Sequence, residues 1–69
     1  MTAWIYIDKS YIKITEIESI GIKYPSENWP KFQVRVVGKS GTEYIVDEQF
    51  DTELNALNHI ELLINRWNI

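Results

Sequence analysis

Four consecutive apolar residues near the start of the chain, Trp4-Ile5-Tyr6-Ile7, constrain the fold more than any other segment. A β-strand points successive side chains to opposite faces, so both faces of such a strand need cover. Only one long helical pattern, from about Asp51 to Trp67, is present to supply it. A sheet that keeps an apolar face open curls, dimerises or binds a partner. We therefore expect this chain to share part of its strand surface with another molecule.

The length of 69 residues predicts one domain spanning 1–69, near the lower limit at which a single core supports itself. The absence of cysteine excludes disulfides and thiolate metal sites and fits a cytoplasmic protein. The sequence contains neither the pattern of a signal peptide nor an apolar stretch of membrane-spanning length. We expect a soluble cytoplasmic protein without membrane contact.

The hydropathy pattern predicts an α+β fold. Alternating apolar and polar residues indicate strands after the polar turn at Asp8, in the segments 11–14, 19–24 and 31–37. Prolines at both ends of the segment 25–30 exclude ladder pairing there, so this segment is a loop. We expect a twisted antiparallel sheet of four or five strands, arranged as a meander, with one C-terminal helix packed on one face.

A hairpin loop at Lys39-Ser40-Gly41 sets the predicted register of the last two strands, with Gly41 in the left-handed conformation. This loop places Val36 opposite Tyr44. It predicts that Phe32, Val34 and Val36 face the core, and that Lys31, Gln33 and Arg35 face outward with Glu43 and Asp47 within diagonal reach.

The helix is predicted to begin after an N-cap at Asp51 or Thr52 and to bury one stripe. Leu54 and Leu62 fall outside that stripe, which consists of Ala56, Leu57, Ile60, Leu63, Ile64 and Trp67.

No residue pattern predicts catalysis, a metal site or a cofactor. Gly38-Lys39-Ser40 matches the end of a phosphate-binding loop, but Gln33 stands where that motif needs a glycine and a strand follows where it needs a helix. His59 is the only histidine and is expected to be a surface residue, because no partner for a triad or a metal site has a matching spacing. The sequence predicts neither an enzyme nor a small-molecule substrate.

A row of cations at Lys31, Arg35 and Lys39 is the best signal for nucleic acid. Through Ser40 the chain holds six basic and four acidic residues, whereas after it Arg66 alone opposes six acids. Cations beside aromatic residues can hold single-stranded nucleic acid, while the net charge of −3 and the acidic partners on the same face oppose that function. A single-stranded nucleic-acid-binding module is the alternative hypothesis.

The favoured hypothesis is a non-catalytic protein–protein interaction or regulatory module, acting as a homodimer or as a small subunit bound to another protein. The predicted interface residues are Trp4 and Tyr6 on the first strand, Trp29 in the proline-bounded loop and Leu62 on the helix. Trp29 could instead fold back to cap the small core.

One set of residues follows a familiar order along the chain: Tyr11-Ile12-Lys13-Ile14, Ile17, Ile20, the hairpin at Ser40-Gly41, and Phe50-Asp51-Thr52 leading into a helix with Ala56. In this order the chain resembles a group of small bacterial and phage proteins, largely uncharacterised, that consist of an antiparallel meander and one C-terminal helix. The likeness covers nearly the whole chain, implies a fold and no activity, and leaves out the loop 25–30. The order of four strands and a helix is also similar to the transcriptional coactivator and Whirly families of single-strand binders, although their basic face is not evident here.

Overall fold

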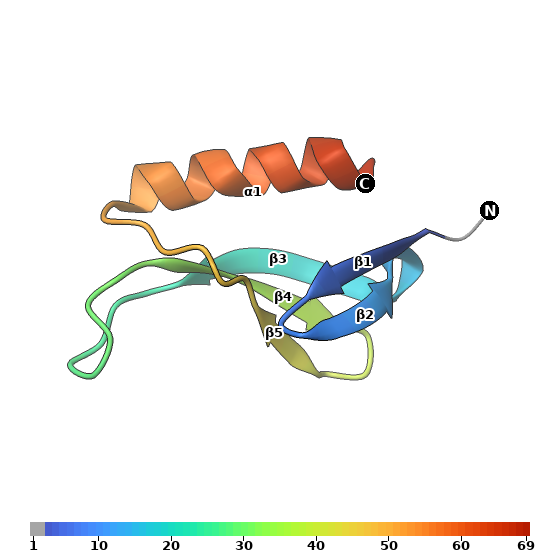
Figure 1. Cartoon of the computed structure of the whole chain (residues 1–69), viewed down its shortest axis with the longest axis horizontal. Coiled ribbons are helices and arrows are strands. Elements are labelled where there is room, and N and C mark those ends of the chain that lie inside the picture. Colours follow the sequence, from blue (N-terminus) through green and yellow to red (C-terminus); the bar gives the residue numbers. More distant parts are fainter. Residues whose placement is uncertain (1–2) are drawn as a thin grey trace.

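The computed structural model describes residues 3–69 and confirms an α+β fold with five strands and one C-terminal helix. The strands form two antiparallel sheets, one with two strands and one with three, and not the single sheet that the sequence predicts. The helix lies along one side of the three-stranded sheet (Figure 1).

The first sheet is a hairpin of β1 (Trp4–Ile7) and β2 (Ser10–Lys13). Ile7 pairs with Ser10, which leaves a two-residue loop, and both loop residues have positive φ: 51° at Asp8 and 63° at Lys9. Left-handed backbone at both positions defines a type I′ turn, whose twist matches that of the two strands. This turn gives the hairpin a fixed register and places the side chains of each strand on defined faces.

A short 3₁₀ helix (Ile14–Glu16) leads into the second sheet, whose order is β3-β4-β5. The strands are β3 (Ile17–Lys23), β4 (Gln33–Gly38) and β5 (Glu43–Ile45). The predicted register of the last hairpin is confirmed, since Val36 pairs with Tyr44 and Gly41 has a φ of 88°. A β-bulge shifts the pairing of β3 between Ile17 and Ser19.

Helix α1 (Glu53–Trp67) begins after the N-cap Thr52, whose side chain accepts a hydrogen bond from the Asn55 backbone at 3.1 Å. It ends at Asn68, which has the left-handed φ of 58°, and the Ile69 N–H donates to the Ile64 carbonyl at 3.2 Å. This pattern is a Schellman C-cap. The helix therefore has caps at both ends that satisfy backbone groups locally.

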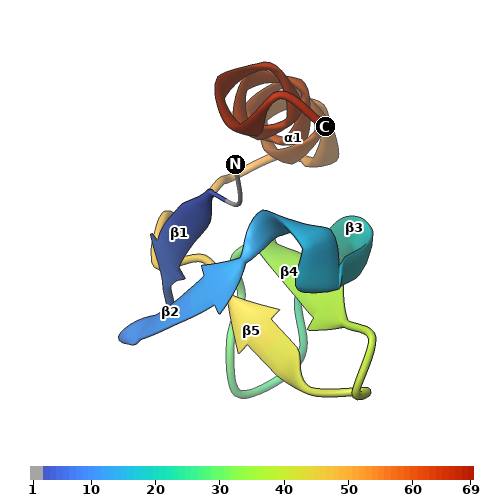
Figure 2. The same ribbon diagram turned by 90° about the vertical axis from the view of Figure 1, so that its right-hand side faces the viewer.

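The core lies where the hairpin, the three-stranded sheet and the helix meet (Figure 2). Each of the three contributes buried apolar side chains: Ile5, Ile7 and Ile12 from the hairpin, Val34 and Val36 from β4, Val46 after β5, and Leu63 from α1. The inner face of β1 is therefore covered by the other sheet together with the helix, and not by the helix alone.

The side chains of Leu57 and Gln33 are not oriented as the sequence predicts. Leu57 is exposed, because it lies about 100° around the helix from the buried Ala56. Gln33 is buried, and its side-chain amide donates to the Val46 carbonyl at 3.4 Å, which gives the buried polar group a partner.

Candidate functional site: an aromatic hairpin face beside an acidic cavity

The outer face of the β1–β2 hairpin is a surface of large exposed aromatic side chains. Trp4 is 57% exposed, Tyr6 62% and Tyr11 69%, whereas Ile5, Ile7 and Ile12 on the inner face are buried. The alternation of the two strands thus places their aliphatic side chains inside and their aromatic side chains outside. We call the surface formed by Trp4, Tyr6, Tyr11 and Lys13 the aromatic face.

Cross-strand pairing holds the side chains of the aromatic face together. Tyr6 pairs with Tyr11, and their ring centroids are 4.8 Å apart with the planes tilted by 59°. Trp4 pairs with Lys13, whose Nζ lies 5.5 Å from the Trp4 ring centroid, within the range of a cation–π contact. Such contacts restrict the rings before any partner arrives, which lowers the entropy lost on binding.

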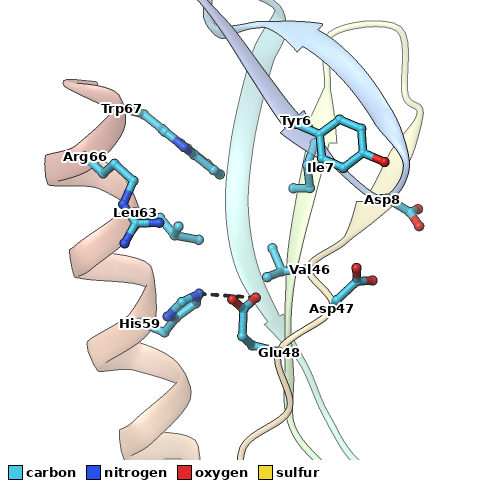
Figure 3. Close-up of a pocket in the computed structure, with 10 residues that line it drawn as sticks. All are labelled: Tyr6, Ile7, Asp8, Val46, Asp47, Glu48, His59, Leu63, Arg66 and Trp67. Carbon is cyan, nitrogen blue, oxygen red and sulfur yellow. Dashed lines mark ion pairs between the residues drawn. The ribbon is translucent and has the colours of Figure 1, made fainter.

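An open cavity of about 240 Å³ lies beside the aromatic face, and Tyr6 belongs to both (Figure 3). Three segments build its wall: the end of β1 with the following turn, the segment that follows β5, and the helix. Its charged and titratable side chains besides Tyr6 are Asp8, Asp47, Glu48, His59 and Arg66, and its apolar ones are Ile7, Val46, Leu63 and Trp67. Three carboxylates therefore face a single guanidinium.

His59 lies in the wall of this cavity and is not the surface residue that the sequence predicts. Its side chain is only 13% exposed, and its ring packs on Phe50 with a centroid distance of 5.0 Å. Nε2 lies 3.8 Å from a carboxylate oxygen of Glu48 and is buried without a hydrogen-bond partner. The helical spacing of His59 from Ala56 and Leu63 was the signal for its position on the inner side.

The other two predicted interface residues lie apart from the aromatic face. Trp29 is 40% exposed in the loop between β3 and β4, at the opposite end of the molecule from the hairpin (Figure 1). Its backbone pairs with that of Ser26, with N–H to oxygen distances of 2.8 and 3.1 Å. Leu62 is 49% exposed on α1. The structure therefore brings Trp4 and Tyr6 together and adds Tyr11 and Lys13, which the interface prediction left out.

The predicted basic row has acidic partners. Lys31 forms an ion pair with Asp51, and Arg35 lies 3.7 Å from Glu43, the diagonal neighbour that the hairpin register predicts. Lys39 is exposed in the loop between β4 and β5. Two of the three cations therefore already face a carboxylate, which reduces their attraction for phosphate.

Tyr24, a side chain with a shifted pKa, lies outside the site, directly after β3. A side-chain hydrogen bond to Glu53, together with the negative charge of that carboxylate, raises the pKa of Tyr24 above its usual value. The ring of Tyr24 packs edge-on against Phe32, with centroids 5.8 Å apart. The Tyr24–Phe32 contact joins the two ends of the loop that connects β3 to β4.

The chain matches no family model, no curated protein and no solved structure. Within residues 3–69, no group of three or more His, Cys, Asp or Glu side chains is placed to hold a metal ion. In the same part of the chain, no helix has the length and apolar character needed to cross a membrane.

Proposed function

We propose that this chain is a non-catalytic protein–protein interaction module and that it binds its partner through the aromatic face. The observation that carries the proposal is the exposure of Trp4, Tyr6 and Tyr11 on one side of a single hairpin. Tryptophan and tyrosine are enriched at protein interfaces, where they supply large contact areas at a small entropic cost. A surface of this kind is rarely left uncovered without a binding role.

The partner is a second copy of the chain or another protein. The pairing of Lys31 and Arg35 with carboxylates lowers their attraction for phosphate, so we do not extend the proposal to nucleic acid.

The experiment compares the wild-type chain with a double variant, Trp4→Thr/Tyr11→Thr. Threonine retains the strand preference of both positions, and neither side chain lines the acidic cavity. The matched control is Leu54→Gln, which removes an exposed apolar side chain from the helix. Circular dichroism verifies that all three proteins are folded.

Sedimentation velocity measures self-association, and affinity capture with quantitative mass spectrometry measures binding to other proteins. We expect the wild type and Leu54→Gln to share an oligomeric state or a set of captured proteins that the double variant loses. If the double variant behaves like the wild type in both measurements, the aromatic face is not the binding surface. Trp29→Ala and Leu62→Gln, tested in parallel, show whether the two remaining candidates contribute.

A further inference from the structure

The cavity beside the aromatic face has a strongly unbalanced charge. Asp8, Asp47 and Glu48 carry three negative charges, and Arg66 carries the one permanent positive charge of the lining. No basic side chain of residues 3–69 forms an ion pair with Asp8 or Asp47, and Nε2 of His59 lies 3.8 Å from a carboxylate oxygen of Glu48. In Figure 3 the side chains of Asp8 and Asp47 lie on the strand side of the cavity, across from the helix.

The rest of the lining suits a long side chain with an apolar stem. Ile7, Val46 and Leu63 form apolar walls, and the Tyr6 ring stands at the border with the aromatic face. A volume of about 240 Å³ is smaller than the pockets of roughly 300–1,000 Å³ that hold drug-sized ligands. The cavity is therefore closer in size to one side chain than to a drug-sized ligand.

An independent feature of the wall is an unmade hydrogen bond. Nε2 of His59 is buried and has no partner, and Glu48 lies too far away to supply one. A buried polar atom without a partner is costly. In the tautomer with its proton on Nδ1, Nε2 is an acceptor, and a hydrogen-bond donor that reaches this part of the cavity would pair it. The carboxylates of the lining favour a positively charged ligand, and Nε2 as an acceptor favours a ligand that is rich in N–H donors.

We propose that this cavity receives the arginine side chain of a basic segment in a partner protein, whose neighbouring residues lie on the aromatic face. The inference rests on the proposed function and names the chemistry of the partner. Arginine fits better than lysine, because its planar guanidinium stacks on aromatic rings and donates several hydrogen bonds to carboxylates. The carboxylates of the cavity repel phosphate groups. Binding of phosphate at the cavity is therefore a result that the experiment must exclude.

The experiment titrates the full-length, ¹⁵N-labelled chain with N-acetyl-arginine amide and follows the backbone amides by NMR. The matched probe is N-acetyl-citrulline amide, which has nearly the same shape but no charge. We expect saturable shifts at Asp8, Asp47 and His59 with the arginine compound in the millimolar range. Binding of the citrulline compound should be weaker by at least about tenfold, because the charge-assisted hydrogen bonds are lost.

Two variants with equal changes in net charge locate the site. Asp8→Asn/Asp47→Asn removes two charges at the cavity and should weaken binding of the arginine compound by about three- to tenfold. Glu18→Gln/Glu27→Gln removes two exposed charges outside the cavity lining and should leave that affinity unchanged. Circular dichroism controls for the fold of both.

Three results would each overturn the inference: no saturable shift at the cavity, equal shifts with the citrulline compound, or equal losses in the two variants. Inorganic phosphate that shifts the same amides as strongly as the arginine compound would overturn it as well, in favour of an anion site. Trp4→Thr/Tyr11→Thr separates this inference from the proposed function. That variant should still bind the arginine compound, whereas it loses the protein partner.

Discussion

Lys9 has a left-handed backbone conformation, which L-residues other than Asn and Asp seldom adopt. Its φ of 63° lies in the left-handed region, where the Cβ of an L-residue is crowded by its own backbone at a cost of about 1–2 kcal/mol. Asp8 shares this conformation, but aspartate tolerates it better because its short side chain can bond locally. The type I′ turn that orients the aromatic face is therefore formed with one residue that opposes it.

Replacing Lys9 with glycine should stabilise the protein. Lys9→Gly relieves the crowding, which stabilises the folded state, and adds chain entropy to the unfolded state, which opposes this gain. Because the first effect is the larger, we expect the free energy of unfolding to rise by about 0.5–1 kcal/mol. Urea denaturation measures the change. Lys39→Gly is the control, since Lys39 lies in the other hairpin loop without a positive φ and gains nothing from glycine. A less stable Lys9→Gly protein would show that the turn is not strained.

At the scale of elements, the N-cap of α1 links the sheet to the helix that completes both the core and the cavity. Thr52→Ala removes the acceptor for the Asn55 N–H, so we expect the free energy of unfolding to fall by about 1 kcal/mol, measured by urea denaturation. Thr52→Ser retains a hydroxyl at the same position and should lose much less. Equal losses in the two variants would assign the effect of Thr52 to its methyl group.

The elements that local sequence determines were predictable. Gly41 and the alternation around Val36 set the register of the last hairpin, and the pair Asp51-Thr52 indicated the beginning of the helix, where Thr52 is the N-cap. Both were predictable because turns and caps depend on residues close in sequence. The division into two sheets was not predictable from such signals. It depends on how the β1–β2 hairpin packs against β4 and α1, which are distant in the chain.

At the scale of the whole molecule, the candidate site was also predictable only in part from the sequence. The apolar run Trp4–Ile7 predicted an uncovered strand face, and the structure leaves Trp4 and Tyr6 exposed. The cavity was not foreseen, because Asp8, Asp47 and His59 meet there only through the tertiary arrangement. Single residues with no local motif carry no sequence signal of where they meet.

The two sheets share one core, and the protein should therefore unfold as one unit. The hairpin joins the rest mainly through the buried side chains of Ile5, Ile7 and Ile12. Ile12→Val removes one methylene from that contact and should lower the free energy of unfolding by about 0.5–1.5 kcal/mol. If folding is cooperative, amide hydrogen exchange in β4 should accelerate to the same extent as exchange in the hairpin.

Ile20→Val, in the other sheet, provides the reciprocal test, because it should also accelerate exchange in β1 and β2. A hairpin that exchanges faster in Ile12→Val while β4 stays unchanged would mean that the aromatic face opens separately from the core. Partner binding would then have to order the hairpin, and the affinity would be lower than a rigid surface allows.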